Sequence, residues 1–145
     1  MQIVANNEKQ KLCLPNELIV GAGNIADECM LGYYSDGIRE IVINVDVLES
    51  EGAWEALETV CHEAYHSYEY RMVDLYCNAD DDLKGLSVFE AAAVYADELS
   101  DYSDSTVDYD AYYSQLCESD AREYASETVG EYYLLLTEYM AVKAS

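Results

Sequence analysis

Residues 54–76 read WEALETVCHEAYHSYEYRMVDLY. At about 100° per residue, one stripe of this segment is apolar and aromatic. It consists of Trp54, Leu57, Cys61, Tyr65, Tyr68 and Met72. The spacing predicts a helix that begins near Ser50, buries this stripe and ends near Tyr76, before the turn-forming residues 78–82.

The same segment contains the motif His-Glu-x-x-His at His62, Glu63 and His66. Positions i and i+4 of a helix point the same way, so both imidazoles can bind one zinc ion. Glu63, one residue further round the helix, can reach a water molecule beside that ion and act as a general base. Both histidines flank the apolar stripe, where ligands at the floor of a cleft are expected. The motif therefore predicts a catalytic zinc site on this helix.

A catalytic zinc site uses three protein ligands and keeps one position open. The chain has two histidines in all, and the extended motif is absent, because Glu69 and Met72 stand where its Gly and its third His would be. The third ligand is therefore expected to be a carboxylate from elsewhere in the chain. Two glutamates with alanines nearby compete for this role, Glu90 and Glu118.

Outside this segment, strand patterns come first and helical patterns follow. Strands are expected over residues 18–20, 28–34 and 39–44, and the Ser-Asp-Gly turn at residues 35–37 joins the last two into an antiparallel hairpin. The first fifty residues thus read as strand and turn. Two further helices, residues 86–102 and 112–142, flank an acidic loop at residues 100–110. On the last helix the residues expected to face inward are Ala121, Ala125, Val129, Tyr132, Leu136 and Tyr139. We expect an α+β fold.

Composition limits the partners of the chain. Its 145 residues suit a single domain, residues 1–145, and 51% hydrophobic content favours a folded chain over a disordered one. Seven basic and 30 acidic residues give a net charge of −23, which repels phosphate and argues against binding nucleic acid or an anionic membrane. Five cysteines without CxxC spacing indicate reduced thiols. With no signal-peptide core and no apolar run of about 18 residues, we expect a cytoplasmic protein.

Two further patterns carry little weight. Residues 21–26 match the glycine-rich dinucleotide fingerprint after a strand, but too few residues precede Gly32 to form the helix that this fold requires. Acidic clusters at residues 80–82 and 104–110 lack the ligand spacing of a calcium loop. We interpret these segments as solvated loops.

The hairpin of residues 32–44, the HExxH motif and the later Glu118-x-x-Ala-x-x-Tyr-Ala pattern together resemble the small gluzincin metallopeptidases of the ImmA/IrrE type and their relatives in phages and mobile elements. The similarity covers the layout of residues 14–130, and its specific parts are the HExxH motif and the Glu118 helix. In that family the glutamate of the second pattern is the third zinc ligand. The resemblance thus favours Glu118 over Glu90, whose pattern has Ala96 in the aromatic place.

The resemblance implies a minimal zincin-like domain, in which a short twisted, antiparallel-edged sheet packs on the HExxH helix and a ligand helix crosses it. It implies a zinc metalloendopeptidase that cleaves a protein or peptide bound along an edge strand, with Glu63 as general base. Members of that family cleave repressors of mobile elements, so a basic DNA-binding regulator is a candidate substrate.

Two questions about the site stay open. Because no histidine is left to stabilise the oxyanion, Arg122 and Tyr124 are the candidates for that role. The alternative to a peptidase is a non-catalytic acidic module on the same fold, an inhibitor that mimics nucleic acid or masks a basic partner.

Overall fold

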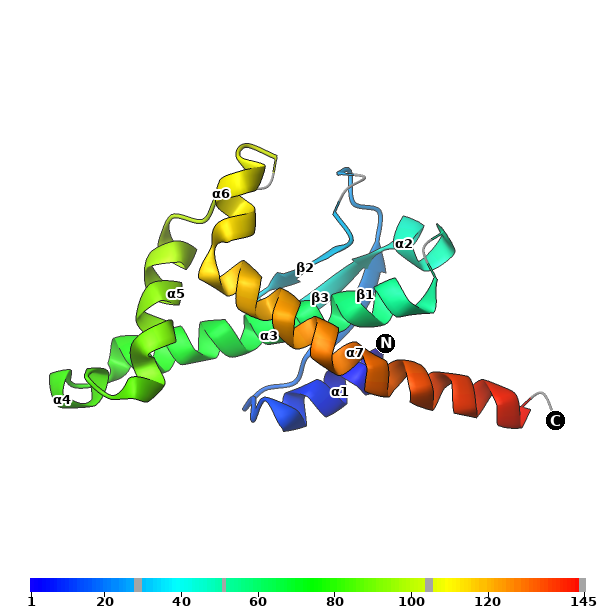
Figure 1. Ribbon diagram of the computed structural model, residues 1–145, viewed down its shortest axis with the longest axis horizontal. Helices are drawn as coiled ribbons and strands as arrows, with labels where there is room; N and C mark the ends of the chain where they lie inside the picture. The colour runs from blue at the N-terminus through cyan, green and yellow to red at the C-terminus, as the bar shows by residue number, and fades with distance from the viewer. Residues whose placement is uncertain (28–29, 51, 104–105, 144–145) are drawn as a thin grey trace.

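The computed structural model describes residues 1–27, 30–50, 52–103 and 106–143. It contains a small sheet and a larger share of helix, so the α+β class is confirmed at that level (Figure 1). The elements in chain order are α1 (Gln2–Lys11), β1 (Ile19–Gly23), β2 (Gly32–Ser35), β3 (Glu40–Asn44), α2 (Val45–Ser50), α3 (Ala53–Asn78), α4 (Asp81–Lys84), the 3-10 turn η1 (Ser87–Phe89), α5 (Glu90–Ser100), α6 (Tyr109–Ser114) and α7 (Leu116–Lys143).

The sheet has the strand order β1-β3-β2. β2 and β3 form the antiparallel hairpin that the sequence predicts, with Tyr33 opposite Val42. β1 joins the other side of β3 in parallel, a pairing that the sequence analysis does not anticipate. Ile41 and Ile43 of the central strand are buried, and β2 lies at an edge of the sheet. The sheet packs against α3, and its edge strand β2 lines the cleft that is described below.

Helix α3 is the central layer of the fold. It contacts β2 and β3 on one side and α7 on the other, and α7 crosses in front of it in Figure 1. Val60, Cys61 and Ala64 of α3 are fully buried and share one core cluster with Ala125 and Val129 of α7. Small side chains at this crossing let the two helices approach closely.

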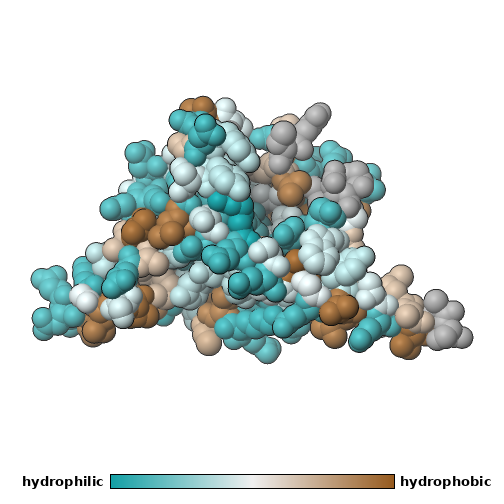
Figure 2. Space-filling view, viewed as in Figure 1, coloured by the Kyte–Doolittle hydropathy of each residue, from teal (hydrophilic) through white to brown (hydrophobic). Residues whose placement is uncertain are grey.

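The predicted apolar stripes are buried only in part. Leu57 and Cys61 lie in the core, whereas the side chain of Trp54 is 39% exposed and meets the ring of Tyr133 edge-on. On α7 the inward residues are buried as far as Tyr132, and the expectation that Tyr139 faces inward is wrong. The last turns of α7 extend past the elements that could cover them, and Figure 2 shows apolar residues gathered along that end.

The first fifty residues are more helical than expected, because α1 and α2 occupy segments interpreted as strand or turn. In α1, the buried residues are Val4, Ala5 and Glu8. The Glu8 carboxylate accepts hydrogen bonds from the hydroxyls of Tyr124 and Tyr132 on α7. These long-range polar contacts hold α1 in place, and the local apolar pattern of residues 2–11 does not predict a helix there.

The other sequence interpretations have mixed outcomes. Gly21 and Gly23 lie within β1, and residues 24–27 form no helix, so the dinucleotide fingerprint lacks its structural context. The cysteines at positions 13, 61, 77 and 117 are free, and Cys29 lies outside the described residues. In the part of the chain that the structure describes, no helix is both long and apolar enough to span a bilayer.

Gly32, at the start of β2, sets the distance between the edge strand and α3. A Cβ atom at this position would lie 2.7 Å from Thr59 Cγ2 on α3 and 2.8 Å from the Val42 carbonyl oxygen. Both distances are too short for any side chain larger than hydrogen. The edge strand therefore lies against α3 only because residue 32 is glycine.

We predict that Gly32→Ala lowers the free energy of unfolding by about 1–3 kcal/mol, because the new methyl group forces β2 away from α3. Gly37→Ala is the matched control, since nothing lies within 4 Å of a Cβ atom there, and it should change stability by less than about 0.5 kcal/mol. Urea unfolding followed by circular dichroism measures both. Equal stability of the two variants would contradict the close approach.

Candidate metal centre and its cleft

Helix α3 presents the two histidines on one face. His62 and His66 are four residues apart, so their side chains are neighbours on the helix surface. The two Nε2 atoms lie 3.0 Å apart, and the rings meet edge to face with centroids 4.7 Å apart. At this distance one nitrogen donates a hydrogen bond to the other, or both lone pairs point at a shared cation.

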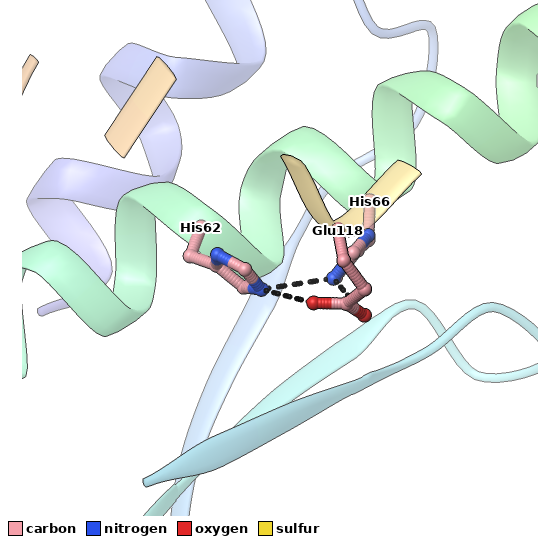
Figure 3. A group of neighbouring side chains, drawn as sticks. All are labelled: His62, His66 and Glu118. Carbon is pink, nitrogen blue, oxygen red and sulfur yellow. Dashed lines mark hydrogen bonds and ion pairs between the residues drawn. The ribbon is translucent and has the colours of Figure 1, made fainter. Parts of the chain in front are cut away.

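The third member of the cluster, Glu118, comes from the first turn of α7. The Glu98 carboxylate of α5 accepts hydrogen bonds from the backbone N–H groups of Leu116, at 2.8 Å, and Cys117, at 3.0 Å. This carboxylate satisfies two of the free N–H groups at the start of α7. Glu98 thereby holds the first turn of α7 in place. Figure 3 shows the Glu118 side chain of this turn beside the two histidines.

One ligand atom from each of His62, His66 and Glu118 lies within 4.8 Å of the other two, and each imidazole faces a different oxygen of the carboxylate. Glu118 Oε2 lies 3.4 Å from His62 Nε2, and Glu118 Oε1 lies 3.5 Å from His66 Nε2. Two imidazole nitrogens and one carboxylate form a donor set that zinc prefers. The proximity and the chemistry of the three groups thus fit a zinc ion.

The buried carboxylate of Glu118 is only partly satisfied by the protein. Its side chain is 1% exposed, and its Oε1 atom accepts a hydrogen bond from the Tyr102 hydroxyl. Among the described residues, its Oε2 atom has no hydrogen-bond partner, and the guanidinium nitrogen Nη1 of Arg122 lies 3.8 Å away. A buried carboxylate oxygen without a partner is costly, which is a second reason that a cation suits this place.

The electrostatics of the cluster keep its carboxylate ionised. Burial would raise the pKa of Glu118, but the neighbouring imidazoles of His62 and His66 and the Tyr102 hydroxyl outweigh burial and lower it to about 2. For His66, burial would lower the pKa, but the hydrogen bond to Glu69 and the charges of Glu63, Glu69 and Glu118 raise it to about 9. The same negative surroundings that hold a proton on His66 would attract a metal ion.

Glu69 is a site residue that the sequence analysis misses. Its Oε2 atom lies 2.7 Å from His66 Nδ1, and its side chain is fully buried. Burial raises the pKa of Glu69 to about 7, and His66 opposes that rise. A hydrogen bond at Nδ1 leaves the Nε2 lone pair of His66 free on the side of Glu118, as in carboxylate–histidine–zinc sites. The sequence could have indicated this contact, because Glu69 follows His66 by three residues and residues i and i+3 of a helix are neighbours.

A cleft of about 1260 Å³ opens beside the cluster. Glu63 lines it together with both histidines and Glu118, and the side chain of Glu63 is 7% exposed. Gly32, Tyr33 and Tyr34 of the edge strand β2 form part of its wall. The proposed base, the proposed ligands and an open strand edge therefore share one cavity.

Of the other predicted site residues, Arg122 lines the cleft, whereas Tyr124 and Glu90 do not. Arg122 lines the cleft, and its Nη2 atom donates to the Tyr113 carbonyl at 2.5 Å. Tyr124 is not among the residues that line the cleft, since its hydroxyl donates to Glu8 and its ring packs on Tyr65. Glu90 is exposed at the start of α5 and is outside the His62, His66 and Glu118 group. Tyr102 and Tyr112, which line the cleft near Glu118, were not predicted.

Comparisons of the chain with models of protein families, with curated proteins and with solved structures found no match.

The ligand assignment predicts which glutamate variant loses zinc. Glu118→Ala should lower zinc affinity by at least about tenfold, because one of three ligands is removed. Glu90→Ala should bind one zinc ion as the wild type does. Elemental analysis after gel filtration with added zinc checks both. Zinc loss in the Glu90 variant alone would move the assignment to Glu90, and a wild type that binds no zinc would rule out the site.

Glu69→Gln should lower zinc affinity by about 10–100-fold, because glutamine keeps the shape but removes the charge that orients His66. Glu127→Gln, on the exposed face of α7, is the matched control. Competition with a chromophoric chelator measures both affinities at one pH. An unchanged affinity in the Glu69 variant would show that the contact with His66 does not support metal binding.

Proposed function

We propose that this protein is a zinc-dependent peptidase that hydrolyses peptide bonds of a protein substrate. The observation that carries the proposal is the cluster of His62, His66 and Glu118, whose ligand atoms, one from each residue, all lie within 4.8 Å of one another beside Glu63 in an open cleft. A structural role for the metal alone would need no open cleft and no carboxylate one residue from a ligand.

When bound, zinc supplies a Lewis acid that polarises the carbonyl of the scissile bond and lowers the pKa of water. Glu63 accepts a proton from the attacking water and then delivers it to the nitrogen of the leaving amine. Its low exposure keeps that proton away from bulk solvent. The products are one new carboxylate and one new amine.

Arg122 is the residue we assign to the developing negative charge on the carbonyl oxygen. It lines the cleft, and the Tyr113 carbonyl and ring hold its guanidinium in place. A donor that is already oriented costs little reorganisation when charge develops. The hydroxyls of Tyr102 and Tyr112, in the same cleft, are further donors close to Glu118.

The edge strand supports a peptide as substrate. β2 has a paired side toward β3 and an outer side at the edge of the sheet, and three of its residues line the cleft. An extended peptide can add to such an edge through main-chain hydrogen bonds while its side chains enter neighbouring pockets. A peptide added to β2 would run along the cleft that both histidines line.

The proposal includes a zincin-like fold of the ImmA/IrrE type. Its support is the chain order of an antiparallel hairpin, the HExxH helix and a crossing helix that begins with Glu118. The net charge of −23 favours a basic substrate, because opposite charges accelerate encounter and like charges slow it. A basic DNA-binding regulator remains our candidate for the substrate.

Glu63→Gln tests the mechanism. Glutamine keeps the shape of the side chain but cannot accept the proton, so hydrolysis should fall by about 10²–10⁴-fold while zinc content and unfolding stay unchanged. The assay uses a random mixture of fluorescence-quenched peptides with zinc-loaded protein. Glu55→Gln, in the first turn of the same helix, is the control and should retain wild-type activity.

Two results would overturn the proposal. Activity near the wild-type level in the Glu63 variant would remove this residue from the mechanism. A zinc-loaded wild type that cleaves no peptide in the mixture would favour the non-catalytic acidic module instead.

A further inference from the structure

Four tyrosines form one wall of the cleft, and we call them the tyrosine wall. They are Tyr102, Tyr109, Tyr112 and Tyr113, from α6 and the segment before it. Their rings contact one another with centroids 5.8–6.2 Å apart. Tyr109 is 60% exposed and Tyr102 is 45% exposed, although both line a cavity. The wall therefore offers aromatic faces to whatever enters the cleft.

Tyrosine rings bind most of the cations of this chain. Four of its seven basic side chains, Lys11, Lys84, Arg122 and Lys143, lie over tyrosine rings at 3.9–5.5 Å from the centroid. One of these contacts lies in the cleft itself, where the Arg122 guanidinium covers the Tyr113 ring at 3.9 Å. The negative face of an aromatic ring attracts a cation in this geometry. One tyrosine of the wall thus already holds a cation, and Tyr109 and Tyr102 present further faces.

The cleft also contains carboxylates that the proposed chemistry does not use. Glu58 lies one helical turn before His62 on α3, and Glu123 follows Arg122 on α7. In the described part of the chain neither carboxylate has a basic partner within 4.0 Å. Apart from His62 and His66, Arg122 is the one basic residue among the described residues that line the cleft. Its guanidinium lies beside Glu118 and Tyr113, so Glu58 and Glu123 are left as carboxylates that a cation from outside the protein can meet.

From these observations we propose that the cleft binds a lysine or arginine side chain of the substrate between the tyrosine wall and the carboxylates of Glu58 and Glu123. This inference rests on the proposed function, since the cation belongs to the peptide that the site would cleave. It goes further by naming the side chain that the cleft selects and the residues that select it.

Neutral and acidic side chains fit these surroundings less well. An apolar side chain would gain contact with the rings but would leave both carboxylates without a partner. An acidic side chain would meet Glu58, Glu123 and the negative faces of the rings, which repel it. A lysine or arginine uses its aliphatic stem against the wall and its charge toward the carboxylates.

The experiment measures binding rather than cleavage. Labelled alanine-based decapeptides that differ at one central position, which is lysine, arginine, norleucine or glutamate, are titrated with the Glu63→Gln protein with and without zinc. Norleucine is the matched neutral analogue of lysine. Anisotropy should show that the lysine and arginine peptides bind about three- to tenfold more tightly than the norleucine peptide, and the glutamate peptide most weakly.

Three variants, each added to the Glu63→Gln background, locate the subsite. Tyr109→Leu should remove the preference for lysine over norleucine, whereas Tyr109→Phe should keep it, because phenylalanine retains the aromatic face. Glu123→Gln should reduce lysine binding about two- to fivefold. The controls are Tyr139→Leu and Glu127→Gln, which change an exposed tyrosine and an exposed glutamate of α7 outside the cleft. Neither control should alter the preference.

The outcomes separate this inference from the proposed function. Equal affinities for the lysine and norleucine peptides, or no binding of any peptide, would overturn the cation subsite even if the wild type cleaves peptides. A preference that survives Tyr109→Leu would also overturn it. A preference with the predicted variant pattern in a wild type that hydrolyses nothing would support the subsite and refute the peptidase.

Discussion

The burial of Glu118 is the constraint on which the site depends. Its carboxylate is nearly inaccessible to water where α7 crosses α3, and an ionised group in such a place must be compensated by neighbouring donors or charges. The two imidazoles, a tyrosine hydroxyl and a guanidinium supply part of that compensation. Moving α7 along α3 by one turn would carry Glu118 and Arg122 together away from both imidazoles. The position of the helix crossing therefore fixes the distances between the carboxylate and the histidines.

Much of this arrangement could be predicted from the sequence because it is local. The apolar period of α3, the i and i+4 spacing of the histidines and the turn between β2 and β3 all depend on neighbours along the chain. Glu118 is favoured over Glu90 by the resemblance to the ImmA/IrrE type, through the alanines and the tyrosine that follow it. The structure brings Glu118 to within 3.5 Å of both histidines.

The features that escaped prediction depend on contacts between distant segments. α1 carries few apolar residues and is held by Glu8, whose tyrosine partners lie more than a hundred residues away. The parallel pairing of β1 with β3 follows from how the chain returns to the sheet, which no period reveals. Tyr102 reaches Glu118 from a segment that reads as an acidic loop. Trp54 and Tyr139 continue the apolar stripes of α3 and α7 to positions where the side chains stay partly exposed.

The ligands of the candidate metal centre come from positions 62, 66 and 118, and this spread along the chain couples the metal to the fold. The unfolded chain cannot hold these three groups together, so an ion that binds them binds the folded state only. A ligand with that selectivity stabilises the folded state by about 2.7 kcal/mol when its free concentration is a hundred times its Kd. The supply of zinc would then regulate the amount of folded protein. Metal starvation would lower its abundance through this effect on folding, independently of any effect on catalysis.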